Sequence, residues 1–167
     1  HMKMIIDGKK VDSVSKETFD VIAPATGIVV DNVPKATAED IEKAVTAAVK
    51  GQKEWEKFSV TERADVLYKF IDIVELNKES LAQTLCAENG KPITEARAEI
   101  GNIKIAFRAF AEHAKHYYGS IIPPGTEAGQ ENHIQMVTRE PIGVVACIIP
   151  FNFPCDLYDQ KVAPALM

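Results

Sequence analysis

The feature that most constrains the fold of this chain is an unbroken run of small and apolar residues, 143–149, that ends at Pro150. A run of this length without alternation is typical of a strand buried on both faces of a parallel sheet. Pro150 ends the strand because proline brings no N–H to the hydrogen-bond ladder. The sequence therefore predicts a buried strand at 143–149, which requires neighbouring strands and covering helices.

A turn and a helix are predicted after this strand. Pro154 disfavours helical geometry at Phe153 and is itself suited to the first turn of a helix. In that helix Leu157, Lys161 and Leu166 alternate with Asp156, Asp159 and Gln160. Ligands of open α/β sheets bind at the carboxyl ends of strands, so Asn152, at the centre of the turn, is a candidate ligand-facing amide. Asparagine is also a common turn residue, which leaves a purely structural role open.

Length and charge exclude several classes of protein. The 167 residues suit one domain or one and a half, and a net charge of −5 gives no electrostatic footprint for nucleic acid. The apolar runs are too short to cross a membrane, and no secretory leader is visible, so we expect a cytoplasmic protein that binds neither membranes nor nucleic acid. Residues 1–2 match a cloning scar and are left out of the expected domain, 3–167.

The cysteines and histidines predict no metal site. Cys86, Cys147 and Cys155 are odd in number and form no C-x-x-C pair, so neither a disulfide framework nor a zinc site is expected. His113 and His116 have a spacing that metals accept, but no acidic or cysteine partner completes a ligand set.

The first part of the chain is expected to be β-structure. Residues 4–6 and the turn at 7–10 indicate a short hairpin. The alternating segment 18–22 and the extended segment 28–33 flank a second turn at 24–27. We expect these short strands to form an arm lying over another surface.

Three helical segments are expected next. Thr37 can cap the first, which presents an apolar face that includes Ile41 and Val45. The second begins at Ser59 with a capping box, is interrupted near Asn77 and ends at Gly90.

Pro92 opens the third helical segment, which is expected to run to Gly119. Its apolar seam consists of Ala96, Ile100, Ile103, Phe107, Phe110, Ala114 and Tyr117. The spacing indicates a core helix that packs on the other two, rather than a separate coiled coil.

A second hairpin is predicted from residues 120–122 and the alternating segment 134–138, joined by a long polar loop. The strand at 143–149 then stands alone, although a strand of its kind needs neighbours on both sides. The expected explanation is that this chain is the front of a larger α/β protein.

Four stretches, in this order and spacing, resemble the N-terminal part of the aldehyde dehydrogenase superfamily. They are Ala23–Gly27, Glu88–Pro92 with Glu95 and Ala96, Arg139–Val145, and Pro150–Pro154 with Lys161–Leu166. The resemblance implies an α/β fold in which this chain supplies a β arm, a three-helix layer, part of a β oligomerisation flap (about 120–140) and the first strand and turn of a Rossmann-type NAD(P) domain.

The resemblance also implies functional roles. Asn152 would be a catalytic oxyanion-hole donor to the alkoxide that a thiolate forms on an aldehyde. The residues expected to contact NAD or NADP are Ile148, Ile149, Pro150 and Phe151. Those expected to line the substrate tunnel are Phe153, Leu157 and Gln160. A homo-oligomer is implied for the parent protein.

The chain departs from the family pattern in ways that bear on substrate and activity. Phe151 stands where many members have tryptophan, and Gln160 stands where many have an aromatic residue. The polar Gln160 indicates a small, oxygenated aldehyde, and the Phe-Asn-Phe turn is most similar to lactaldehyde or glycolaldehyde dehydrogenases and to non-phosphorylating glyceraldehyde-3-phosphate enzymes. The family's nucleophilic cysteine and general-base glutamate would lie beyond Met167, so the chain alone is expected to be inactive. A self-contained helical interaction module without catalysis is the alternative.

Overall fold

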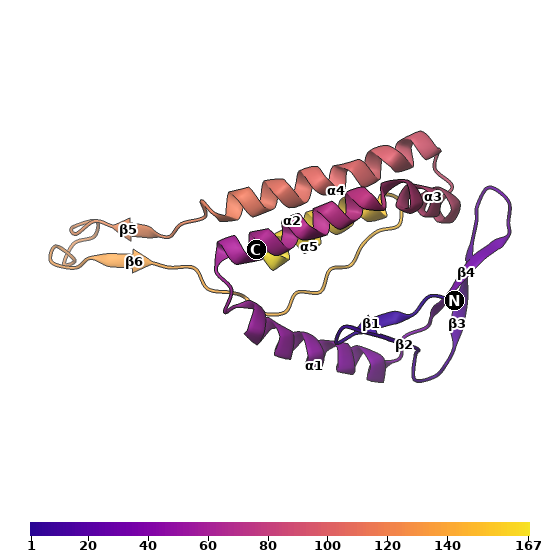
Figure 1. Ribbon diagram of the computed structural model, residues 1–167. Coiled ribbons are helices and arrows are strands. Elements are labelled where there is room, and N and C mark those ends of the chain that lie inside the picture. Colours follow the sequence, from indigo (N-terminus) through magenta and orange to yellow (C-terminus); the bar gives the residue numbers. More distant parts are fainter.

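The computed structural model describes residues 1–167 and has a layer of helices, from which two β-structures extend (Figure 1). The helices are α1 (Ala38–Trp55), α2 (Val60–Leu76), α3 (Lys78–Asn89), α4 (Ile93–Ala114) and α5 (Pro154–Leu166). The strands are β1 (Met4–Ile6), β2 (Lys9–Val11), β3 (Thr18–Ile22), β4 (Val29–Pro34), β5 (Ser120–Ile122) and β6 (Gln135–Val137). The three sheets are separate antiparallel pairs: β1 with β2, β3 with β4 and β5 with β6.

The hydrophobic core lies between α2, α3, α4 and α5. Phe107 of α4 is 2% exposed and contacts the rings of Phe70 and Tyr158. The buried core consists of Ala64, Leu67, Ile71, Val74, Ala82, Leu85, Ala96, Ile100, Ile103, Phe107, Ala111 and Ala163. The core helix expected after Pro92 is confirmed, because helical spacing brings one face of α4 against the neighbouring helices.

The predicted helix starts and stops are mostly confirmed. Thr37 and Ser59 each form a capping box, which satisfies backbone N–H groups that the first turn leaves free. The second helical segment divides at Asn77, and Gly90 ends α3 with a φ of 80°, a left-handed conformation that favours glycine. Only the predicted end of the third helical segment is wrong. The helix α4 ends at Ala114 rather than Gly119, and the chain then turns towards β5.

The N-terminal β-structure is tied to α1 by a buried carboxylate. Asp40 accepts hydrogen bonds from the Ser13 hydroxyl at 2.8 Å and from the backbone N–H of Thr37 at 2.9 Å. The Thr37 N–H above all lowers the pKa of Asp40 to about 2. The expected apolar face of α1 remains uncovered, because Ile41 is 58% exposed and few contacts connect α1 with the helical layer.

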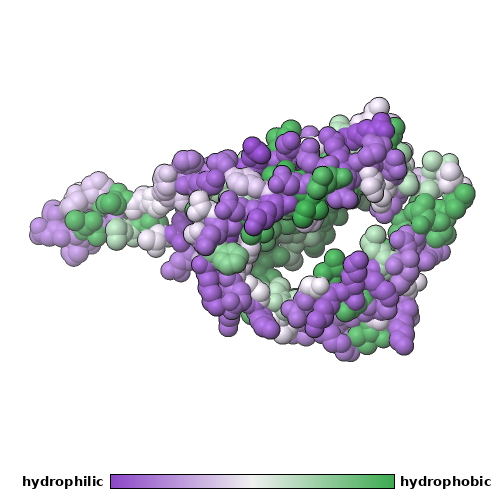
Figure 2. All heavy atoms as spheres, viewed as in Figure 1, coloured by the Kyte–Doolittle hydropathy of each residue, from purple (hydrophilic) through white to green (hydrophobic).

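The predicted strand at 143–149 is wrong for this structure. Residues 140–150 form neither helix nor strand, and Val144 and Val145 are exposed. A parallel strand exists only when a neighbour satisfies its backbone groups, and no strand of the described chain lies beside this segment. In Figure 1 the segment runs as an extended connection from β6 to α5, and Figure 2 shows a hollow between α1 and the helical layer. No helix is both long enough and apolar enough to cross a membrane.

Candidate functional site

The candidate site is the turn at 150–153, where the extended connection enters α5. Pro154 occupies the first turn of α5, as predicted, and Phe153 precedes it with non-helical geometry. Asn152 is exposed, and its side-chain amide takes part in none of the hydrogen bonds of the structure. The amide is therefore free to donate to a ligand.

The turn is held through its carbonyl groups. The Asn89 amide donates to the Phe151 carbonyl at 2.7 Å, and the Lys91 ammonium donates to the Asn152 carbonyl at 3.0 Å. Gly90, between them, reverses the chain, and a side chain there would come within 3.2 Å of Pro24. The Glu88–Pro92 stretch, identified in the sequence as one of the family-like stretches, thus contacts the Asn152 turn directly.

A buried glutamate completes the arrangement. Glu99 of α4 is 3% exposed and forms an ion pair with Lys91. Its second oxygen accepts from the backbone N–H groups of Cys155 at 2.8 Å and Asp156 at 3.4 Å. No side chain of α5 caps its own first turn, so Glu99 satisfies those donors from another helix, where a negative charge is favoured by the helix dipole.

The four residues expected to contact a dinucleotide lie together at the end of the extended connection. Ile148 is 83% exposed and Phe151 is 81% exposed. Backbone groups from 148 to 151 make no backbone hydrogen bonds. The segment therefore presents apolar side chains and backbone N–H and C=O groups of which only the Phe151 carbonyl is bound, by Asn89. This combination suits the flat rings and polar edges of a dinucleotide.

The three residues expected in the substrate tunnel are brought together by helical spacing. Phe153, Leu157 and Gln160 follow one another at i, i+4 and i+7. Gln160 is exposed and Leu157 is half-buried. On α5 this side lies away from the face that packs on the core, which carries Ala163.

Cys155, the cysteine that follows the candidate turn, is poorly suited to act as a nucleophile. All three cysteines are half-buried free thiols. Burial above all raises the pKa of Cys155 to about 11, with the nearby Glu99 carboxylate adding to the shift. Its thiol is therefore protonated at neutral pH and is a poor nucleophile.

The environment of Asp159 differs from what the sequence indicated. The sequence places it among the polar residues that alternate with Leu157, Lys161 and Leu166, yet it is 1% exposed, and neither carboxylate oxygen has a hydrogen-bond partner. The reason is that α5 packs closely on α4, and Asp159 lies on the same face as Ala163, four residues later. Burial above all, together with the charges of Asp156 and Glu99, raises its pKa from 3.8 to about 6.

This burial makes stability depend on pH. The native state keeps the Asp159 proton between pH 3.8 and about 6, where the unfolded state has released it, so stability falls as the pH rises through that window. Asp159→Ala should therefore raise the free energy of unfolding by about 1–2 kcal/mol at pH 7.5 and by much less at pH 4. Urea unfolding across this range measures the difference. Asp72→Ala, at an exposed position of α2, is the control. An increase in the free energy of unfolding of Asp159→Ala that does not change with pH would contradict the prediction.

Sequence reasoning missed Lys91 and Glu99 as a pair. Glu99 lies three residues after Ala96 and one before Ile100, inside the apolar seam of α4. A charged residue at a core position is almost always paired, and this signal could have led to a search for its partner.

Comparisons with known proteins agree with the resemblance seen in the sequence. The model of the aldehyde dehydrogenase family matches residues 10–167. The chain is 43% identical over 161 residues to 3-sulfolactaldehyde dehydrogenase of Pseudomonas putida, covering 96% of this chain and 32% of that protein. It is 38% identical over 165 residues to succinate semialdehyde dehydrogenase of Acinetobacter baylyi, covering 98% of this chain and 33% of the relative.

Solved structures match the fold closely. NADP-dependent glyceraldehyde-3-phosphate dehydrogenase from Bacillus halodurans, complexed with NADP, superposes with a TM-score of 0.95 at 32% identity, over 99% of this chain and 35% of that one. An NAD-dependent aldehyde dehydrogenase from Sinorhizobium meliloti gives a TM-score of 0.90 at 36% identity, over 99% of this chain and 33% of that one. The chain thus spans about a third of the length of the proteins it matches.

Proposed function

This chain belongs to the aldehyde dehydrogenase family, and we propose that it supplies the N-terminal part of an NAD(P)-dependent enzyme that oxidises a small, oxygenated aldehyde to the carboxylic acid. The observation that carries the proposal is the free amide of Asn152 on a turn whose carbonyls are fixed from a neighbouring loop. A cysteine and a general base supplied by residues outside this chain would complete the site.

Asn152 acts as the oxyanion donor in this proposal. A thiolate adds to the aldehyde carbon, and the electron pair of the C=O bond moves to oxygen, which becomes an alkoxide. A preorganised N–H donor stabilises that charge as it develops. Hydride then leaves the carbon to give a thioester, which water hydrolyses to the acid and the free thiol.

NAD or NADP would bind along Ile148, Ile149, Pro150 and Phe151. The exposed side chains of Ile148 and Phe151, and backbone groups that make no backbone hydrogen bonds, support this placement. The cofactor, when bound, accepts the hydride. The residues of this chain would orient it beside the turn and keep water away from its ring.

The substrate class follows from the tunnel residues. Phe153 and Leu157 supply apolar walls, whereas Gln160 offers an amide to a hydroxyl or other oxygen on the aldehyde. A relative named for a hydroxylated substrate, 3-sulfolactaldehyde, supports this choice.

The proposal predicts activity for the full-length protein and none for the chain of 167 residues. The full-length enzyme should oxidise lactaldehyde and glycolaldehyde at least about tenfold more efficiently than hexanal, and Gln160→Leu should reduce that preference. Reduction of NAD and NADP followed at 340 nm, with heat-treated protein as the control, measures both. An inactive full-length protein contradicts the proposed function. Turnover by the chain alone contradicts the placement of the nucleophile outside it.

A homo-oligomer contact is proposed for the β5–β6 hairpin, which projects well beyond the helical layer (Figure 1). Ile121 and Met136 are directly paired across the hairpin and are 67% and 73% exposed. Apolar side chains on a projecting hairpin favour contact with another chain. Ile121→Asp should lower the mass of the full-length protein in light scattering, and an unchanged mass would contradict this assignment.

A further inference from the structure

The side chains that hold the candidate oxyanion donor come from the end of α3, the loop after it and α4. We propose that Asn89, Lys91 and Glu99, named here the turn clamp, are positioning residues that hold the Asn152 amide at the angle needed to donate to the alkoxide. This inference rests on the proposed function of Asn152 as the donor.

The geometry of the turn clamp explains how it would act. Asn89 and Lys91 bind the carbonyls of two successive residues, Phe151 and Asn152, at 2.7 and 3.0 Å. The two carbonyls belong to the peptide groups on either side of the Asn152 Cα. Fixing both carbonyls therefore fixes both peptide planes, and with them the direction of the Cα–Cβ bond of Asn152. The side-chain amide itself is left without a partner, so the turn is held without occupying the group that would do the chemistry.

Glu99 makes the arrangement rigid. The side chain of Lys91 is 7% exposed and that of Glu99 is 2% exposed, so water cannot readily replace their mutual contact. Glu99 also binds the Cys155 N–H at 2.8 Å, and Lys91 lies 4.3 Å from the centre of the Phe153 ring. The turn clamp therefore binds both the turn at 150–153 and the N-terminal end of α5.

Other ion pairs of the chain do not have this character. Lys43–Glu39, Arg97–Glu79 and Lys104–Glu75 all lie at the surface. A buried ion pair contributes little to stability compared with apolar residues of similar size. We therefore infer that the Lys91–Glu99 pair matters for the geometry it imposes on its neighbours. Here the hydrogen bonds of the pair end on the turn carbonyl and on the start of α5.

The test uses the full-length protein and the double variant Lys91→Met/Glu99→Leu. Replacing both charges together avoids leaving one buried charge unpaired, which would threaten folding. The variant should acylate roughly 10- to 100-fold more slowly, because a small displacement of a catalytic group lowers the reaction rate by a factor of this size. Its dissociation constant for NAD(P) should change less than about threefold, because the cofactor contacts are made by 148–151.

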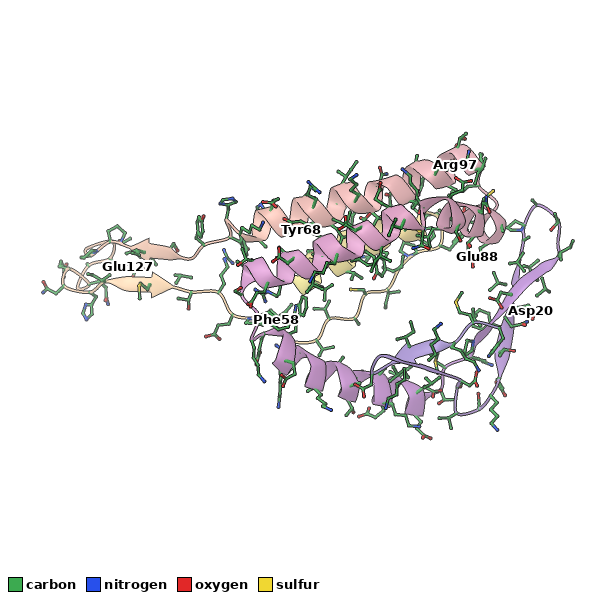
Figure 3. The ribbon with its side chains drawn as sticks, viewed as in Figure 1. Asp20, Phe58, Tyr68, Glu88, Arg97 and Glu127 are labelled. Atoms are coloured by element: carbon green, nitrogen blue, oxygen red, sulfur yellow. The ribbon has the colours of Figure 1, made fainter.

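A matched control is available in the same helices. Arg97 of α4 pairs with Glu79 of α3 at 2.7 Å, both side chains are exposed, and Figure 3 shows Arg97 near the start of α4. The variant Arg97→Met/Glu79→Leu likewise replaces a basic and an acidic residue with methionine and leucine, without touching the turn. Its acylation rate should stay within about twofold of wild type.

Combining the clamp variant with Asn152→Ala distinguishes a positioning role of the turn clamp from a general effect on stability. In an Asn152→Ala background the clamp variant should slow acylation less than about threefold further, since the group it positions is already gone. Hydrogen exchange of a peptide spanning 151–157 should accelerate about tenfold in the clamp variant, and other peptides should not change. If the double variant does not fold, Asn89→Ala removes one clamp bond without affecting a charge and should show a smaller loss of acylation with the same coupling.

Two results would overturn the inference: acylation at the wild-type rate in the folded clamp variant, or an equal loss in both backgrounds. A wild-type enzyme without aldehyde oxidation would instead refute the proposed function. In that case, unchanged hydrogen exchange at 151–157 in the clamp variant would show that the turn clamp does not hold the turn. Faster hydrogen exchange there would show that the turn clamp stabilises the turn but has no part in catalysis.

Discussion

Asn152→Ala in the full-length protein should lower the acylation rate about 100- to 1,000-fold, equivalent to about 3–4 kcal/mol of transition-state stabilisation. In the proposed mechanism the amide is a donor that is already in place when charge appears on the aldehyde oxygen. Cofactor affinity should change little, because the residues assigned to the cofactor, 148–151, do not include Asn152. Pre-steady-state acylation kinetics and a fluorescence titration with NAD(P) measure the two quantities.

The structure sharpens the control for this variant. The Asn152 side chain makes no hydrogen bond, so its truncation should leave the melting temperature nearly unchanged. A purely structural Asn152 would show the opposite pattern, with a lower melting temperature and near-normal acylation of the folded protein. Asn152→Asp should be at least as harmful as Asn152→Ala, because a carboxylate repels the developing alkoxide.

Phe107→Ala should destabilise the 167-residue chain by about 3–5 kcal/mol. Phe107 lies at the centre of the core with 2% of its surface exposed, and its ring is 4.7 Å from that of Phe70 and 6.2 Å from that of Tyr158. Removing it leaves a cavity bordered by α2 and α5, which rigid helices cannot readily close. The melting temperature should fall by roughly 6–20 °C.

Ile105→Ala is the matched control, since it removes an apolar side chain from the same helix. Ile105 is 68% exposed, and alanine has the higher helix propensity, so the change should be within about 0.5 kcal/mol. Chemical unfolding of both variants beside wild type tests the prediction. Similar losses at the two positions would mean that the core does not lie where the structure places it.

Local sequence signals determined where several of the helices begin or end. The capping boxes at Thr37 and Ser59 mark helix starts because their hydroxyls bind N–H groups within the same turn, with no help from the rest of the fold. Gly90 ends α3 for an equally local reason, since its φ of 80° is costly for other residues. Pro154 at the start of α5 belongs with these signals. The family was also identifiable from short stretches in a fixed order.

Signals that depend on distant partners misled the sequence analysis. Residues 143–149 have the composition of a buried strand, but a strand also needs a neighbour to bind its backbone, and composition does not supply one. Asp159 looked like a solvated residue because of its charge, but packing of α5 on α4 encloses it. Ile41 looked like a core residue because of its spacing, but no other element covers it.

By itself the sequence determined the helices, the hairpins, the family and the placement of Asn152 in a turn before α5. Only the tertiary structure decided what holds that turn, because Lys91 and Glu99 lie about 60 residues before it along the chain. Such contacts depend on how α4 and α5 pack, and helix periodicity gives the face of each helix without giving its partner. The Lys91–Glu99 pair could therefore be recognised as a unit only after the helices were placed against one another.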